Sequence, residues 1–345
     1  MNTDQLIALS KEVIQESAET ISALNPDPIP RYLVLRDVLG LDTSDSELVE
    51  AKQKLFTSRW VQLLQETQWE DGSWGRFHGE DYQLKQKIPT TEHGISLALS
   101  WGLDHTDTLL QKTMAYIEGH LDGKYQWRDK AEKHEDPDAW PIVTRFLSAA
   151  NLALIDKHHP KLKVYHDTWV QIVMEAFKTG EYNRETEITA TQKLMGIKYK
   201  TPGQYHKKYP LILLSSTQER LDEGLEQAIL AYAYSYPNGI GYLYQSKISE
   251  MPSVDDRTFL YWLRTQMLLS RFPLWHRFIG QKISEILAQR NDEGLWSFAP
   301  NVAKRPHTYL PLSESWRKKA NKGIDYTVSV LRLLAKFVDQ ADGLL

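Results

Sequence analysis

The sequence contains no cysteine among its 345 residues. A chain without thiols forms no disulfide bond, no thiolate zinc site and no cysteine nucleophile. It also lacks a long hydrophobic run, because no apolar stretch approaches the roughly 18 residues that a membrane-spanning helix needs. The N-terminal segment reads as an amphipathic helix with acidic residues rather than as a signal peptide. We therefore expect a cytoplasmic protein without a membrane span.

A charge excess of one sign is missing as well. The 41 Lys and Arg residues face 45 Asp and Glu residues, which leaves a formal net charge of -4. This balance provides no general attraction for nucleic acid, so we expect no nucleic-acid partner. The hydrophobic fraction of 41% is typical of a soluble globular protein.

What the sequence does contain is helical periodicity along most of its length, without the alternation of β-hairpins. Some segments are apolar nearly all round, which is typical of helices buried on most faces, whereas others carry one apolar stripe beside charged residues. The first kind comprises residues 32–41, 93–103, 144–155 and 326–338, and the second comprises 46–66 and 277–289. This pattern predicts an all-α protein.

Turns that combine glycine with aromatic residues separate these helices. One copy, QWEDGSWG, occupies residues 68–75, and a variant, RNDEGLWSF, occupies 290–298. Glycine supplies the backbone freedom needed at a helix C-terminus, an acidic residue can cap the reversing chain, and the tryptophan can pack on the helix end. We therefore predict a structural role for the turns. Looser copies lie at residues 122–127, 179–183 and 237–244, and the helix expected after the third copy covers 188–197.

The repeating unit of one-sided helix, turn and buried helix predicts an α/α toroid. We expect this domain to cover residues 31–345, after a helical extension at residues 1–30. A linear helical solenoid is the alternative. The nearly all-round apolar character of the second helix in each unit favours a closed ring, because a solenoid would leave one face of it in water.

The first turn carries a family resemblance. Gln68, Gly72 and Trp74 match the QW motif (Q-x3-G-x-W) of squalene–hopene and oxidosqualene cyclases, and the second copy keeps the glycine and tryptophan with Arg290 in place of glutamine. The chain thus resembles the α/α toroids of the terpenoid cyclases and protein prenyltransferases. This resemblance implies the fold but no particular reaction.

Within this superfamily the absence of cysteine excludes two branches. The prenyltransferase zinc site and the thioester of complement-like toroids both need a cysteine, and residues 255–259 lack the last acid of the magnesium-binding DDxxD motif. There is also no pair of histidines at metal-binding helical spacing. We therefore predict neither a metal nor another cofactor.

Class II cyclases carry a DxDDTA segment at the start of an inner helix, and its middle aspartate protonates an alkene or epoxide. Residues 253–259, SVDDRTF, are similar to this segment, with Ser253 in place of the first acid and Arg257 inserted. The resemblance implies that Asp255 is the catalytic acid and Asp256 its partner, in the protonation-initiated cyclisation of an isoprenoid. The simpler interpretation makes Ser253 a helix N-cap and places the acids in the first helical turn.

Other candidates lie at or near the starts of further predicted inner helices. Glu92 and His93 form the most interesting alternative pair, because a carboxylate can orient an imidazole; capping by these residues is the simpler role. Aromatic residues on inner helices can stabilise a carbocation if they face the lumen, and fill the core otherwise. The predicted substrate-binding residues are Trp140, Tyr232, Tyr261, Trp262, Trp316, Glu92 and His93.

Two functions remain as alternatives to cyclisation. One is a non-catalytic toroid that binds a prenyl chain, a peptide or a glycan in its cavity. The other is a carbohydrate-active α/α barrel, in which acids at the rim, such as Asp136 and Asp138, perform glycosidic or lyase chemistry. Family cyclases normally have a second similar domain, so the shorter chain suggests a smaller substrate, a partner chain or a homo-oligomer, or lost activity. The basic loops at 156–166 and 197–209 either meet a diphosphate or are simply solvated.

Overall fold

The structure is a computed structural model that describes residues 2–79, 83, 86–127, 138–197, 204–217, 221–297 and 311–343. These residues form helices and no β-strand, so the predicted all-α fold class is confirmed. No helix in the described ranges has both the length and the apolar character needed to cross a membrane. The α-helices are α1 (Thr3–Ala23), α2 (Pro28–Leu33), α3 (Ser46–Leu55), α4 (Arg59–Thr67), α5 (Thr91–Ser100), α6 (Thr108–Leu121), α7 (Trp140–Ile155), α8 (Lys163–Ala176), α9 (Arg184–Met195), α10 (Lys208–Leu214), α11 (Glu223–Ser235), α12 (Phe259–Leu269), α13 (His276–Leu287) and α14 (Lys319–Asp342). A π-helical turn, η1 (Val34–Val38), and two 3-10 turns, η2 (Pro160–Leu162) and η3 (Pro273–Trp275), complete the helical elements.

The chain divides into two compact units. Unit 1 comprises residues 1–62, 237–239 and 243–345, and unit 2 comprises residues 63–236 and 240–242. The expected boundary after residue 30 falls inside unit 1. A closed toroidal ring stays a prediction.

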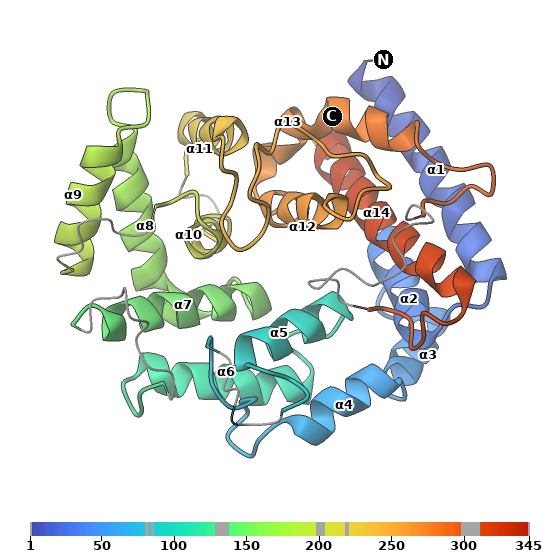
Figure 1. Cartoon of the computed structure of the whole chain (residues 1–345), viewed down its shortest axis with the longest axis horizontal. Helices are drawn as coiled ribbons and strands as arrows, with labels where there is room; N and C mark the ends of the chain where they lie inside the picture. The colour runs from blue at the N-terminus through green and yellow to red at the C-terminus, as the bar shows by residue number, and fades with distance from the viewer. Residues whose placement is uncertain are drawn as a thin grey trace. The chain divides into compact units, whose positions relative to one another are not determined.

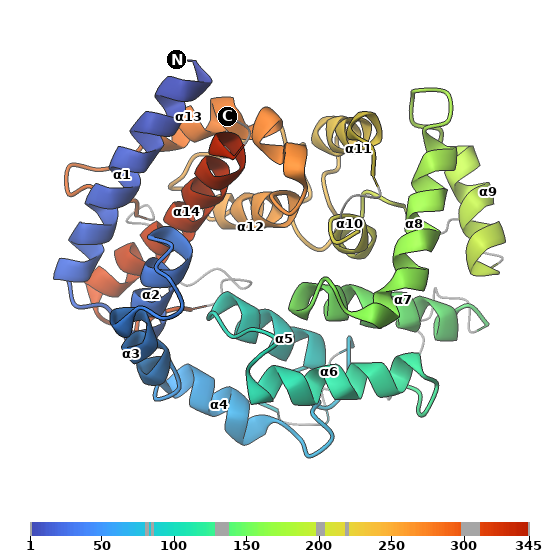
Figure 2. The same cartoon turned by 180° about the vertical axis from the view of Figure 1, so that it is seen from behind.

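In unit 1, the N-terminal helix α1 packs along α14 and against α13 (Figures 1 and 2). Its apolar stripe is buried, and polar contacts along its length hold it to other segments of unit 1. The hydroxyl of Ser17 donates to the Gly294 carbonyl oxygen at 2.7 Å, and the Lys11 ammonium lies 2.7 Å from the Asp342 carboxylate. The segment expected as an extension is therefore an integral part of unit 1.

Two of the helices predicted from periodicity have different bounds in the structure. Residues 46–66 form α3 and α4 rather than one helix, because the chain turns at residues 56–58 and the Ser58 hydroxyl accepts the backbone N–H of Val61. Residues 32–41 form the end of α2 and the π-helical turn η1. Periodicity located the buried residues of both segments but not the breaks between their helices.

In unit 2, α10 packs on α7 and α8, and residues 211–214 of its apolar run are all buried. The helix that follows the third turn, α9, packs on α8 but leaves most of its residues half-buried or exposed, since threonine, lysine and glutamate occupy much of its surface. The prediction that residues 188–197 form an inner helix buried on most faces is therefore wrong.

All five predicted turns contain a glycine in the left-handed region, one or more residues after the end of a helix. A positive φ is strained for residues with a side chain, which explains why glycine recurs there. The five glycines and their φ angles are Gly72 (86°), Gly123 (74°), Gly180 (88°), Gly239 (55°) and Gly294 (78°).

The two tryptophan turns repeat the same hydrogen bonds, one in each unit. The indole nitrogen of Trp74 donates to the Leu64 carbonyl oxygen at 3.1 Å, and that of Trp296 donates to Ile286 at 2.9 Å. The backbone N–H groups of the two tryptophans donate to Thr91 and Thr327 hydroxyls, at 3.0 Å in both cases. Both indoles are fully buried. Each tryptophan therefore joins the helix before its turn to the helix after it, and the predicted structural role is confirmed.

Gly72 and Gly180 offer a matched test of close approach in these turns. Both have a positive φ, but a Cβ on Gly72 would lie 2.2 Å from the Lys112 carbonyl oxygen of α6, whereas one on Gly180 would meet nothing within 4 Å. We expect both alanine variants to lose stability through backbone strain, and Gly72→Ala to lose at least about 1 kcal/mol more through the clash. Urea unfolding measures both; equal losses would contradict the close approach.

Candidate functional site

Asp255 and Asp256 precede α12, which begins at Phe259. Both carboxylates are exposed. Asp256 accepts the backbone N–H and the hydroxyl of Thr258, each at 2.7 Å, and these hydrogen bonds hold its pKa below the ordinary value. The Ser253 hydroxyl donates to Asp255 at 2.5 Å. Because Asp255 is exposed, it does not lie in the dry surroundings that a proton donor to an alkene needs. Ser253 is not the helix N-cap, because the helix starts later with Thr258 as its cap.

Three of the predicted aromatic residues lie in unit 1 with Asp255. Trp262 is fully buried and donates its indole N–H to the Ile248 carbonyl oxygen at 2.9 Å. Trp316 donates to the buried Asp325 carboxylate at 2.8 Å. Tyr261 is half-buried. Trp262 is thus a core residue, whereas Trp316 is half-buried. A role of any of the three in substrate binding stays a prediction.

The predicted residues of unit 2 are Glu92, His93, Trp140 and Tyr232. Trp140 packs edge-on against Trp127, with ring centroids 6.2 Å apart. His93 donates its backbone N–H to the hydroxyl of the helix-capping Thr90 at 3.1 Å. Glu92 and Tyr232 each belong to a buried group of polar side chains.

The loop after the first tryptophan turn is held against the start of α5. The backbone N–H of Thr91 donates to the Arg76 carbonyl oxygen at 2.8 Å, and that of Glu92 donates to Phe77 at 3.0 Å. These two hydrogen bonds hold the backbone of the loop up to Phe77, and His78 follows directly. His78 is therefore brought beside the Glu92 side chain.

His78, Glu92, Lys208 and Tyr209 form what we call the Glu92 cluster. Glu92 Oε2 lies 2.7 Å from His78 Nδ1, and Oε1 lies 2.6 Å from the Lys208 ammonium. The Tyr209 hydroxyl lies 2.8 Å from one carboxylate oxygen and 2.9 Å from the other. The carboxylate is thus surrounded by donors that come from the turn loop and from the first residues of α10.

The electrostatics of this cluster fix its protonation. Burial by itself raises the pKa of Glu92, but the Lys208 charge and the His78 contact outweigh it and lower the pKa to about 2. Burial and the neighbouring Glu92 raise the pKa of Tyr209 well above its ordinary value. At neutral pH Glu92 is therefore an ionised acceptor and Tyr209 a donor. A carboxylate that holds imidazole Nδ1 in this way leaves Nε2 as the nitrogen that exchanges protons.

Tyr242 lies next to the Glu92 cluster and is 72% exposed. Its ring centroid is 6.2 Å from that of His78 and 6.3 Å from that of Tyr209. It is also one of two described non-glycine residues with a positive φ, at 68°. Backbone strain of this kind is concentrated at functional sites. The exposed ring gives the cluster a flat face towards solvent.

The sequence identified Glu92 but not its partners. The imidazole bound to Glu92 is that of His78, 14 positions earlier, and not that of the adjacent His93. Lys208 and Tyr209 lie in the basic loop at 197–209, where residues 198–203 are outside the described residues. Asp136 is also outside them, while Asp138 is exposed.

The other basic loop, at 156–166, has acidic partners for its lysines. Lys161 contacts Asp122, and the Lys163 ammonium lies 2.6 Å from the Asp167 carboxylate. These ion pairs favour a structural role over diphosphate binding. Nowhere in the described part of the chain do three or more His, Asp or Glu side chains gather in a group suited to a metal ion.

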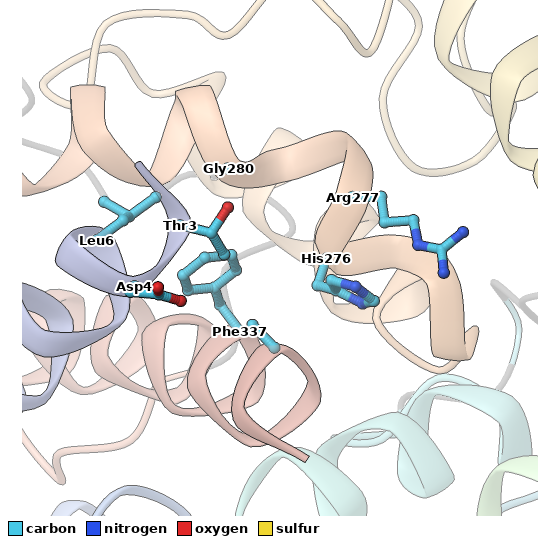
Figure 3. A pocket seen from close by; sticks show the side chains of 8 residues that line it. Thr3, Asp4, Leu6, His276, Arg277, Gly280 and Phe337 are labelled. Atoms are coloured by element: carbon cyan, nitrogen blue, oxygen red, sulfur yellow. The ribbon is translucent and has the colours of Figure 1, made fainter. Parts of the chain in front are cut away.

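A cavity of about 320 Å³ lies in unit 1 between the starts of α1 and α13 and the end of α14 (Figure 3). Its walls combine Asp4, His276 and Arg277 with Leu6 and Phe337. In Figure 3 the Phe337 ring lies beside Thr3, while Arg277 points away from it. The cavity contains no predicted site residue.

No family model, no curated protein and no solved structure matches this chain.

Proposed function

We propose that the protein is an acid–base enzyme whose active site is the Glu92 cluster and whose substrate is a carbohydrate. The observation that carries the proposal is the 2.7 Å contact between His78 Nδ1 and the buried, ionised Glu92. It supplies an oriented imidazole, which is the side chain that most often transfers protons in enzymes. The exposed Tyr242 ring beside it offers a stacking surface for the apolar face of a sugar.

Within carbohydrate chemistry the residues favour elimination over hydrolysis. A glycoside hydrolase needs one protonated carboxyl group as a general acid. With a pKa of about 2, Glu92 is ionised at neutral pH and cannot take this role. An elimination next to a carboxylate needs a base and a cation instead, and His78 and Lys208 fit these roles.

The proposed reaction is the cleavage of a uronic-acid glycan. His78 Nε2 removes the proton from the carbon next to the substrate carboxylate, whose growing negative charge the Lys208 ammonium stabilises. The carbon–oxygen bond one carbon further on then breaks and a carbon–carbon double bond forms. The imidazolium returns its proton to the departing oxygen. Glu92 keeps the imidazole in one tautomer throughout.

The assay follows the ultraviolet absorbance of the unsaturated, conjugated product during incubation with uronate-containing polysaccharides. We expect His78→Ala to lower kcat at least about 100-fold. His105→Ala is the matched control, because His105 is exposed in the connection between α5 and α6. Tyr242→Ala should raise KM more than it lowers kcat. Turnover that survives in His78→Ala would refute the proposal, as would the absence of turnover on every uronate glycan.

Isoprenoid cyclisation is the second candidate. The observation in its favour is the tryptophan turn, whose hydrogen bonds recur in both units and whose motif resembles that of the terpenoid cyclases. The exposure of Asp255 speaks against it, since protonating an alkene needs a dry acid. Incubation with C15, C20 and C30 isoprenoids decides between uronate cleavage and isoprenoid cyclisation. A cyclic product that disappears in Asp255→Asn would favour the cyclase. Ligand binding without turnover would instead favour the non-catalytic alternative.

A further inference from the structure

A second group of aromatic and polar side chains in unit 2 lies apart from the residues of the proposed active site. We call it the tyrosine cluster, and three segments of the chain contribute to it. These segments lie at or next to helices α9, α10 and α11, which are labelled in Figure 1. Tyr182 precedes α9 and Glu187 lies in its first turn, while Tyr205 and His206 precede α10. Tyr232 lies in the last turn of α11 and Tyr236 caps its C-terminus.

Glu187 is the buried carboxyl group of this cluster, with 1% of its surface exposed. The Tyr182 hydroxyl and the Tyr205 backbone N–H donate to its two oxygens. No basic side chain among the described residues forms an ion pair with it, and burial raises its pKa. A buried carboxylate is normally paired with a cation, and each carboxylate oxygen has room for a second donor.

Two neighbours of Glu187 have unused hydrogen-bonding capacity. His206 is 1% exposed, and neither of its ring nitrogens has a hydrogen-bond partner among the described residues. Within the same described ranges, the hydroxyl of the fully buried Tyr205 has no partner either. Burial lowers the pKa of His206 to about 4, so its imidazole is neutral and one nitrogen can accept a hydrogen bond. Unsatisfied groups at this depth are rare in folded proteins and indicate a missing partner.

The aromatic rings surround these acceptors. The Tyr232 ring lies 4.2 Å from that of Tyr182 and 5.8 Å from that of Tyr205, and the His206 ring lies 4.2 Å from that of Tyr236. Faces of aromatic rings attract cations. The cluster thus combines a buried carboxyl group, unused acceptors and several rings, which is the environment that a positively charged group would need.

A cavity of about 300 Å³ lies beside this region. It lies between the α8–α9 turn and the start of α11, and Phe177 and Leu225 contribute to its walls. The Phe177 ring also packs on the rings of Tyr182 and Tyr205, at 5.8 Å and 5.5 Å between centroids. Phe177 therefore separates the cavity from the cluster. Asp222, whose carboxylate caps the start of α11, also lines the cavity.

We propose that the tyrosine cluster binds a primary alkylammonium ion. The ammonium group pairs with Glu187 and donates its remaining hydrogens to Tyr205 and His206, while the alkyl chain lies against the rings and extends past Phe177. A primary ammonium fits better than a quaternary one, because the unused groups need a hydrogen-bond donor. The site is independent of the proposed reaction at Glu92.

Isothermal titration calorimetry of the full chain with n-butylammonium chloride tests this site, with n-butanol as the uncharged analogue of the same length. We expect saturable binding of one n-butylammonium per chain and no binding of n-butanol. Folded wild-type protein that shows no saturable heat with n-butylammonium would overturn the proposal. Equal binding of n-butanol would overturn it too, because the carboxylate would then contribute nothing.

Substitutions in the tyrosine cluster test whether n-butylammonium binds there. Glu187→Gln should weaken n-butylammonium binding at least tenfold, whereas Glu185→Gln, which changes an exposed carboxylate on the same helix, should leave it unchanged. Circular dichroism checks that each variant is folded. Tyr232→Leu alters a half-buried ring at the edge of the cluster and should weaken binding at least threefold; it decides the question if Glu187→Gln does not fold. Undiminished binding in a folded Glu187→Gln or in Tyr232→Leu would overturn the proposal.

Discussion

Replacing Trp74 by alanine should lower the free energy of unfolding by about 3–5 kcal/mol. The indole is fully buried and packs against Gly94 of α5, where a Cβ would lie 2.5 Å from the ring. Its N–H also satisfies the Leu64 carbonyl at the end of α4. The variant would therefore lose the packing of a large side chain and leave a cavity between two helices. Urea unfolding followed by circular dichroism measures the loss.

Trp69 is the matched control for this prediction. It lies in the same turn and is also a tryptophan, but it is 37% exposed. We expect Trp69→Ala to cost less than about 1 kcal/mol. If both variants lost the same small amount of stability, the turn would not be the joint between α4 and α5 that its hydrogen bonds indicate.

The sequence predicted the turns well because their chemistry is local. A glycine after a helix requires a left-handed backbone, and a tryptophan two residues later can reach back to the helix end. Both features depend on residues only a few positions apart, as in Gly72 and Trp74. The same holds for the all-α fold class, which follows from the spacing of apolar residues.

The candidate site could be predicted only in part, because its contacts are distant in sequence. Lys208 lies 116 positions after Glu92, and its ammonium reaches that carboxylate only through the packing of unit 2. His78 has a local cause, the two backbone bonds between its loop and α5, but nothing in the spacing of residues reveals them. The exposure of Asp255 does not follow from the sequence for a related reason: a motif identifies residue types, whereas burial depends on where the helix begins.

The network around Glu92 predicts a characteristic dependence of stability on pH. The folded-state pKa of Glu92 is about 2, below the ordinary value of 4.5. A carboxylate with a lowered pKa stabilises the folded state fully above its unfolded-state pKa, and this stabilisation is lost as the pH falls towards the folded-state value. A difference of this size corresponds to about 3 kcal/mol. Glu187 and Asp325, whose pKa values burial raises, act in the opposite direction.

Comparing wild type with Glu92→Gln isolates this effect, because the contributions of Glu187 and Asp325 are common to both proteins. We expect the variant to be less stable by about 3 kcal/mol at about pH 5.5, since it leaves the Lys208 ammonium without its anion, and the difference to shrink as the pH falls to about 3. Urea unfolding at a series of pH values measures it. Glu66→Gln, which removes an exposed carboxylate of α4, is the control and should change stability little at any pH. A difference between wild type and Glu92→Gln that stays constant down to about pH 3 would show that Lys208 and His78 do not stabilise the ionised form of Glu92.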